Sequence, residues 1–131
     1  MEISFFDRNE IPLPPQEVRI RKLTADPWSD GRRVHVLLEV DPSQKPPSAD
    51  LAIKDENGEE IATASIIENV SRHTEINMHL RGALSSGSFT LYAVLFFFTI
   101  NEFQADGPPS EIERQIVDTA QTKFILTSTK N

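Results

Sequence analysis

Hydrophobic and polar residues alternate along most of the chain, and short clusters of Pro, Gly, Asn and Ser interrupt the alternation. Alternation is typical of a strand with one buried face, and the clusters are typical of turns. The pattern predicts strands over residues 17–25, 33–41, 51–55, 60–67, 74–80, 89–98 and 117–126. A Ser-x-x-Glu capping box at Ser110–Glu113 allows at most one short helical turn. These elements predict an all-β fold, a seven-stranded antiparallel sandwich.

The most apolar stretch, residues 87–100, is too short and too rich in Thr to span a bilayer. It predicts a buried central strand. Alternation places one set of side chains on the core face: Phe89, Leu91, Ala93, Leu95 and Phe97. The opposite face carries Tyr92, Val94, Phe96 and Phe98. Because a sandwich strand needs only one apolar face, this second face requires another cover.

The expected organisation leaves three sources for that cover. Residues 1–15 read as an extended, proline-rich N-terminal arm that carries Phe5 and Phe6, before a sandwich domain over 16–126 and a tail over 127–131. The arm, the long connection 101–116, or another protein chain would hide the face. A second copy of the same chain is slightly favoured, because an open apolar patch of this kind marks interfaces.

Two hairpins are expected from pairing signals. In the first, Val18 lies opposite Val40 and Arg19 lies opposite Glu39, which forms a pair of opposite charges across the strands. In the second, the Asn-Gly dipeptide within residues 56–58 closes a tight turn.

A fold-level resemblance follows from the second half of the chain. Leu80, a loop, and then Gly87-Ser-Phe89-Thr-Leu91 resemble the signal that opens the penultimate strand of immunoglobulin-like and fibronectin type III-like modules. The resemblance covers residues 16–126 and implies a sandwich without a fixed activity. Phe89 stands where the tyrosine corner would be, and no cysteine pair is present, so antibody-type domains are excluded.

The composition of the chain limits the kinds of partner and chemistry that it can support. The chain has 131 residues and a formal net charge of −7, which disfavours nucleic acid. It has no cysteine, which excludes disulfides, thiolate nucleophiles and Cys-ligated metals. The first residues lack the basic and apolar regions of a signal peptide, and no stretch forms a membrane anchor. We therefore expect a cytoplasmic protein without a membrane partner.

The sequence contains few candidate metal-ligating or catalytic residues. On the strand over 74–80, alternation turns His73, Glu75 and His79 outward beside His35. A solvated polar face with cross-strand ion pairs is favoured there over a metal site, and no cofactor is expected. No nucleophile elbow, phosphate loop or metalloprotease helix is present, so no catalytic residue is assigned.

The leading functional hypothesis is a non-catalytic protein-interaction module that binds a protein partner or itself through the outer face of strand 89–98. One alternative is a carbohydrate- or ion-binding module that uses Asp26, Trp28 and Asp30 in the loop over 26–31. Another is an acidic intracellular protease inhibitor, for which size and charge are the only support.

Overall fold

The computed structural model describes residues 11–81, 87–100 and 112–126. Within them lie seven strands: β1 (Ile20–Pro27), β2 (Arg33–Val40), β3 (Ser48–Lys54), β4 (Glu60–Ile66), β5 (His73–His79), β6 (Gly87–Ile100) and β7 (Ile112–Leu126). One 3-10 turn, Pro15–Glu17, precedes them. The expected all-β class is confirmed.

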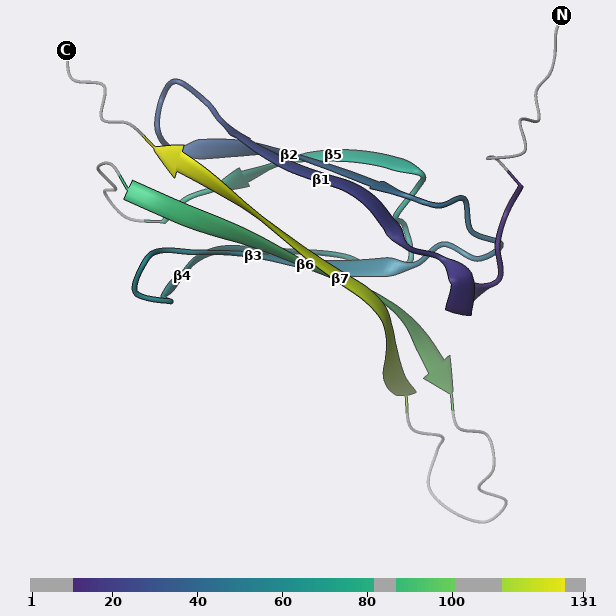
Figure 1. Ribbon diagram of the computed structural model, residues 1–131. Coiled ribbons are helices and arrows are strands. Elements are labelled where there is room, and N and C mark those ends of the chain that lie inside the picture. The colour runs from purple at the N-terminus through teal and green to yellow at the C-terminus, as the bar shows by residue number, and fades with distance from the viewer. Residues whose placement is uncertain (1–10, 82–86, 101–111, 127–131) are drawn as a thin grey trace, which may run out of the picture.

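The strands form two antiparallel sheets that lie one above the other (Figure 1). One sheet has the order β1-β2-β5, and the other has the order β4-β3-β6-β7. β6 is central in the larger sheet, between β3 and β7. This position explains its composition, because a central strand is covered more completely than an edge strand.

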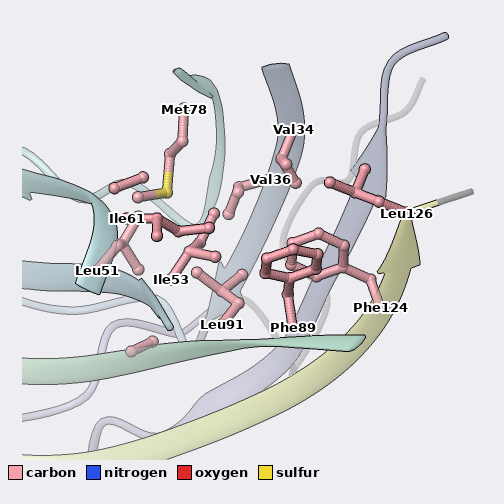
Figure 2. Packing of buried hydrophobic residues seen from close by; sticks show 12 residues of the cluster. Val34, Val36, Leu51, Ile53, Ile61, Met78, Phe89, Leu91, Phe124 and Leu126 are labelled. Atoms are coloured by element: carbon pink, nitrogen blue, oxygen red, sulfur yellow. The ribbon is translucent and has the colours of Figure 1, made fainter. Parts of the chain in front are cut away.

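The core fills the space between the sheets in two adjoining clusters. Figure 2 shows the larger cluster, in which Leu51 and Ile53 of β3 and Leu91 of β6 face Val36 of the opposite sheet. The rings of Phe89 and Phe124 stack at its edge with centroids 5.6 Å apart. Full burial of each such side chain is worth about 1.5–3 kcal/mol, so these contacts dominate the stability of the sandwich.

The pairing of β1 with β2 differs from the expected register. Ile20, rather than Val18, lies opposite Val40, and Lys22 lies opposite Glu39, with a register shift between Ile20 and Lys22. Val18 is fully buried ahead of β1, directly after the 3-10 turn. The predicted register is therefore wrong by two residues at Val40, because the 3-10 turn delays the start of β1, and by three residues at Glu39, because of the register shift.

The segment that precedes the 3-10 turn is joined to the sandwich. Leu13 forms a parallel bridge with Ser43, in which the Leu13 N–H donates to Pro42 O at 2.9 Å and the Gln44 N–H donates to Leu13 O at 2.9 Å. Part of the expected arm over 1–15 is therefore attached to the loop after β2. Phe5 and Phe6 lie outside the described residues.

β7 begins earlier than the sequence indicated. The sequence predicts at most one helical turn over Ser110–Glu113. In the structure Ile112 and Glu113 are strand residues, and residues 110 and 111 lie outside the described ranges. The long β6 provides the reason, because Thr99 and Ile100 are available to pair with Glu113 and Ile112. β3 pairs with β6 only as far as Phe96, so the two long strands continue beyond it as a two-stranded ribbon (Figure 1).

Candidate interaction surface

β6 carries apolar side chains on both sides, as the alternation predicts. Its core-facing residues, from Phe89 to Phe97 at every second position, are all buried. On the solvent side of the four-stranded sheet, which we call the outer face, Tyr92, Val94 and Phe98 are half-buried. The outer face is therefore neither fully hidden nor fully open.

Phe96 departs from this description, because it lies on the outer side of β6 and is fully buried. The guanidinium carbon of Arg114 lies 4.3 Å from the centre of its ring, and the ring of Phe98 meets it edge-on at 5.3 Å. Arg114 is in turn held by Asp50, with Nη1 2.6 Å from Oδ2. Of the three sources of cover that the sequence left open, the 101–116 segment thus supplies one. Phe96 itself is not available for direct contact with a partner.

Arg114 reaches Phe96 because the pairing of β6 with β7 skips one residue. Leu95 pairs with Asp118 and Phe96 pairs with Ile116, so the intervening residue of β7 has no partner opposite it. Such a bulge shifts the alternation by one position and turns Ile116 and Arg114 to the outer face. Sequence reasoning missed both residues, although their alternating spacing is itself a strand signal.

Beside the covered phenylalanine lies a shallow groove of about 240 Å³. It lies over β3, and residues of three neighbouring strands line it: Asp50, Leu51 and Ala52 of β3, Glu60, Thr63, Ala64 and Ser65 of β4, and Tyr92 and Val94 of β6. The Lys54 amino group lies 5.2 Å from the centre of the Tyr92 ring. The groove and Arg114 share Asp50, so they form one continuous surface.

The outer face differs from the rest of the chain in charge and in apolar exposure. Ile116 of β7 is 59% exposed. Among the described residues, strand pairing places three cations (Lys54, Arg114 and Lys123) and two anions (Asp50 and Glu60) on this face, a net charge of +1. The chain as a whole carries −7. The face is therefore the less acidic side of an acidic protein.

The outer side of the three-stranded sheet is polar and internally paired. His73 Nδ1 lies 2.9 Å from Glu39 Oε2, and its Nε2 lies 2.6 Å from Glu75 Oε2. The other oxygen of Glu75 lies 3.2 Å from His35 Nε2, and His35 Nδ1 lies 3.3 Å from Asn77 Oδ1. The histidines therefore lie where the alternation placed them, in a ladder of cross-strand contacts.

The ladder shifts the ionisation of its members. Hydrogen bonds to Glu75, and then to Glu39, raise the pKa of His73 above its ordinary value of 6.5. The same bond to His73 lowers the pKa of Glu75 below 4.5. No group of three or more His, Asp or Glu residues in the described part of the chain is arranged to hold a metal ion.

The loop over 26–31 holds its tryptophan in place. Trp28 is 42% exposed, but its Nε1 donates to Asn77 Oδ1 at 3.0 Å. The guanidinium carbon of Arg33 lies 4.2 Å from the ring centre and occupies one face of the indole. Only part of the ring is left for stacking on a sugar.

The two carboxylates of this loop are not brought together. Asp30 accepts from the Arg32 backbone N–H at 2.9 Å and from Arg33 Nε at 3.0 Å. The backbone bond is the main cause of its lowered pKa. Asp26 lies on β1 opposite His35 and takes no part in these bonds. Asp30 thus stabilises the turn.

A larger groove of about 670 Å³ lies at the end of the three-stranded sheet. Its walls combine apolar and charged residues: Ile11, Leu13, Val40, Pro42, Arg21, Glu39, Asp41, Arg72 and His73. Arg21 contacts both carboxylate oxygens of Asp41, at 2.8 and 3.0 Å, and this bond raises its pKa. Because His73 is also bound by carboxylates, much of the cationic charge in this groove is already neutralised.

Comparisons with known proteins place few limits on function. No protein-family model matches the sequence. No curated protein matches it. Among solved structures, the chain is similar to a β-glucuronidase of Bifidobacterium dentium in complex with coumarin-3-O-glucuronide, with 15% identity and a TM-score of 0.48. The match covers 82% of this chain and 18% of that one, so the chain spans less than a fifth of the length of the enzyme.

The described residues contain no helix that is both long enough and apolar enough to cross a membrane.

Proposed function

We propose that the chain is a non-catalytic module that binds another protein, or a second copy of itself, through the outer face of the four-stranded sheet. One observation supports this most strongly. The half-buried Tyr92 and Val94 and the exposed Ile116 lie beside Arg114, which is stacked on Phe96 and bound to Asp50. Tyrosine and arginine are among the residue types that are enriched in binding hot spots.

The strand order supports an immunoglobulin-like form of this module. In the constant-type arrangement, the first, second, fourth and fifth strands share one sheet, and the third, sixth and seventh share the other. Six strands of the chain have this distribution, whereas β4 lies beside β3 in the second sheet. Modules of this architecture serve many functions, so the proposal rests on the surface rather than on the fold.

The alternative of sugar or ion binding by the 26–31 loop has less support. Arg33 covers one face of Trp28, and Asp30 is occupied by two hydrogen bonds within the turn. A calcium ion would require six or more oxygen ligands. The outer face offers, beside its paired groups, the exposed Ile116 and the half-buried Tyr92 and Val94.

The proposal is tested by an affinity pull-down from an extract of the source cells. The bait is the tagged chain as wild type, as Ile116→Asp, or as the matched control Leu37→Asp on the outer side of β2. We expect at least one protein to be retained by wild type and control and lost by Ile116→Asp, since a buried charge at an interface costs several kcal/mol. Self-association is measured on the same three chains by light scattering. Two results together would refute the proposal: light scattering shows only a monomer, and all three baits retain the same proteins.

A further inference from the structure

The charges of the outer face differ between its two halves. Asp50 and Glu60 lie over β3 and β4 together with Lys54, which gives this half a net charge of −1 among the described residues. Arg114 and Lys123 give the other half, over β6 and β7, a net charge of +2. Such a face is complementary to itself, because a second copy turned over places its cationic half above the anionic half of the first. The chain carries −7, so two copies repel each other less through this face than through the rest of the surface.

The direction of the symmetry axis decides which charges meet. Two copies that pack face to face are related by a two-fold axis that lies between the sheets. If the axis runs parallel to the strands, midway between β3 and β6, β7 of one copy lies over β4 of the other, and β6 lies over β3. If it runs across the strands, β7 lies over β7 and the cations of the two copies face each other. The charges therefore favour the parallel axis, which also keeps the strands of the two sheets within the usual angle of about 30°.

The register of the sheet determines which side chains then meet, because this axis preserves the position along the strands. Thr90 pairs with Lys123 on one side and with Lys54 on the other, and Lys54 pairs with Glu60. Lys123 of one copy therefore lies over Glu60 of the other. Within one copy these two residues are three strand spacings apart, about 14 Å, so they cannot bind each other. No ion pair of Glu60 or Lys123 is found within the described residues, which leaves both charges available.

Two exposed isoleucines meet in the same way. Ile116 is 59% exposed and lies level with Ser48, because both pair with the same residue of β6. Ile67 is 51% exposed and follows Ile66, which packs against the core, so alternation turns Ile67 to the outer side. The N–H of the next residue, Glu68, donates to Ser48 Oγ at 2.7 Å, which places Ile67 beside Ser48. The parallel axis therefore brings Ile116 of one copy over Ile67 of the other.

The groove over β3 supplies a matching shape. Ala52 lies at its floor and pairs with Tyr92, so the axis places the ring of Tyr92 from one copy over Ala52 of the other. The groove has a volume of about 240 Å³, and its walls combine apolar groups with the oxygens of Glu60, Thr63 and Ser65. This chemistry suits a tyrosine, which has an apolar ring and a hydroxyl that seeks a hydrogen-bond partner. No hydrogen bond of the Tyr92 hydroxyl is found in the described part of the chain.

We propose that the outer face docks on the outer face of a second copy, about a two-fold axis parallel to the strands. Tyr92 of each copy fills the groove over β3 of the other. Lys123 pairs with Glu60 at one end of the interface, and Ile116 contacts Ile67 at the other end. This inference rests on the proposed function and names the partner as the chain itself. Because the interface is two-fold, each of these contacts occurs twice.

The charged contact is tested by measuring the dissociation constant of the full-length dimer by sedimentation equilibrium. Glu60→Lys and Lys123→Glu each weaken the dimer at least about tenfold, because two like-charged contacts replace two ion pairs. The double variant Glu60→Lys/Lys123→Glu has the wild-type net charge and returns to within about threefold of the wild-type constant, because opposite charges meet again. Lys22→Glu, on the outer side of β1, is the control, since it has the same net charge as Lys123→Glu and leaves the constant unchanged.

The groove is tested by two further variants. Ala52→Leu fills the groove from within, so it weakens the dimer at least about tenfold although it adds apolar surface. Tyr92→Phe keeps the ring and removes the hydroxyl, and it weakens the dimer about threefold. Urea unfolding of each variant shows that the chain remains folded.

Each contrary result has a distinct meaning. A chain that stays monomeric at its highest soluble concentration overturns the inference, and the proposed function stands if Ile116→Asp still loses a protein in the pull-down. A dimer that Ile116→Asp dissociates, but that the double variant does not restore or Ala52→Leu strengthens, overturns this arrangement and keeps the outer face as an interface. A dimer that neither Ile116→Asp nor the single charge variants weaken uses another surface and overturns the inference. If the pull-down is then also the same for all baits, the proposed function fails too.

Discussion

The ring of His73 lies between two carboxylates, Glu39 on β2 and Glu75 on its own strand, and His35 contacts the far side of Glu75. When His73 is protonated, both ring N–H groups donate to a negative oxygen. When it is neutral, one ring nitrogen faces a carboxylate without a proton between them. The ladder therefore links β2 to β5 most firmly while His73 carries a charge.

The pH dependence follows from the directions of the two pKa shifts. The pKa of His73 is raised from 6.5, so its contribution to stability is complete below 6.5 and is lost as the pH rises through the raised value. The pKa of Glu75 is lowered from 4.5, so its contribution is present above 4.5 and is lost as the pH falls through the lowered value. Both contributions coexist between these two reference values.

We accordingly predict that the urea midpoint of unfolding falls as the pH rises from about 6 to about 9, and that His73→Gln reduces this fall. His79→Gln is the matched control, since no ion pair of His79 is found within the described residues. A nuclear magnetic resonance titration of the His73 ring gives the direct reading. A titration midpoint at or below 6.5 would contradict the assignment.

Ser48 is a buried polar residue of β3, and its hydroxyl accepts from the Glu68 N–H at 2.7 Å. Glu68 has a positive φ of 51°, in the connection between β4 and β5. We predict that Ser48→Ala destabilises the fold by about 1–3 kcal/mol, because this N–H loses its partner. Ser65→Ala, which removes a solvent-exposed hydrogen bond to Asp50, is the control and should change stability by about 0.5 kcal/mol or less. Equal urea midpoints for the two variants would show that the bond does not stabilise the connection.

Residue positions were predictable where alternation is uninterrupted. The alternation of hydrophobic and polar side chains predicted that Tyr92 and Val94 point outward and that the histidines of β5 share one polar face. It could not place Arg114, because the skipped residue between β6 and β7 depends on long-range pairing that no local pattern records. The arginine that covers Phe96 therefore had to be found in the structure.

At the scale of elements, the turn between β3 and β4 is organised by Asp55 and Gly58. Asp55 Oδ1 accepts from the N–H groups of Asn57 and Glu59, each at 2.9 Å, and Asp55 O accepts from Gly58 N at 3.0 Å. Gly58 has φ of 84°, a conformation that residues with a side chain adopt at a cost. The glycine of the expected Asn-Gly turn is thus required by the backbone.

We predict that Gly58→Ala destabilises the fold by about 1 kcal/mol, measured by urea unfolding. An added Cβ meets no atom within 4 Å, so the cost comes from the backbone conformation alone. Gly58→Asn should cost less, because asparagine tolerates the left-handed region. A wild-type midpoint for the alanine variant would contradict this explanation.

Element boundaries were less predictable than element types. The pattern predicts a strand over 17–25, but with the 3-10 turn at Pro15–Glu17 the strand starts at Ile20, and its register differs by two residues at Val40 and by three at Glu39. The start of β7 was missed because Glu113, Arg114 and Gln115, which follow Ile112, are all polar, and they are strand residues only through pairing with the end of β6. For β7, a tertiary contact overrode the local signal.

At the scale of the whole molecule, the sandwich has two unlike outer surfaces. The three-stranded sheet presents a ladder of histidines and carboxylates that bind one another. The four-stranded sheet presents a groove with polar and apolar walls, the exposed Ile116, and Arg114 held over Phe96. The fold class followed from the sequence because seven alternating segments have few other ways to bury their apolar sides.

The central claim is that the second of these surfaces binds a protein. The most direct measurement is the amide resonance footprint of a partner recovered by pull-down, added to the labelled full chain. We predict shifts at Tyr92, Val94 and Ile116, with the signals of His35 and His73 unchanged. A footprint centred on His35 and His73, with the outer face of the four-stranded sheet unperturbed, would contradict the claim.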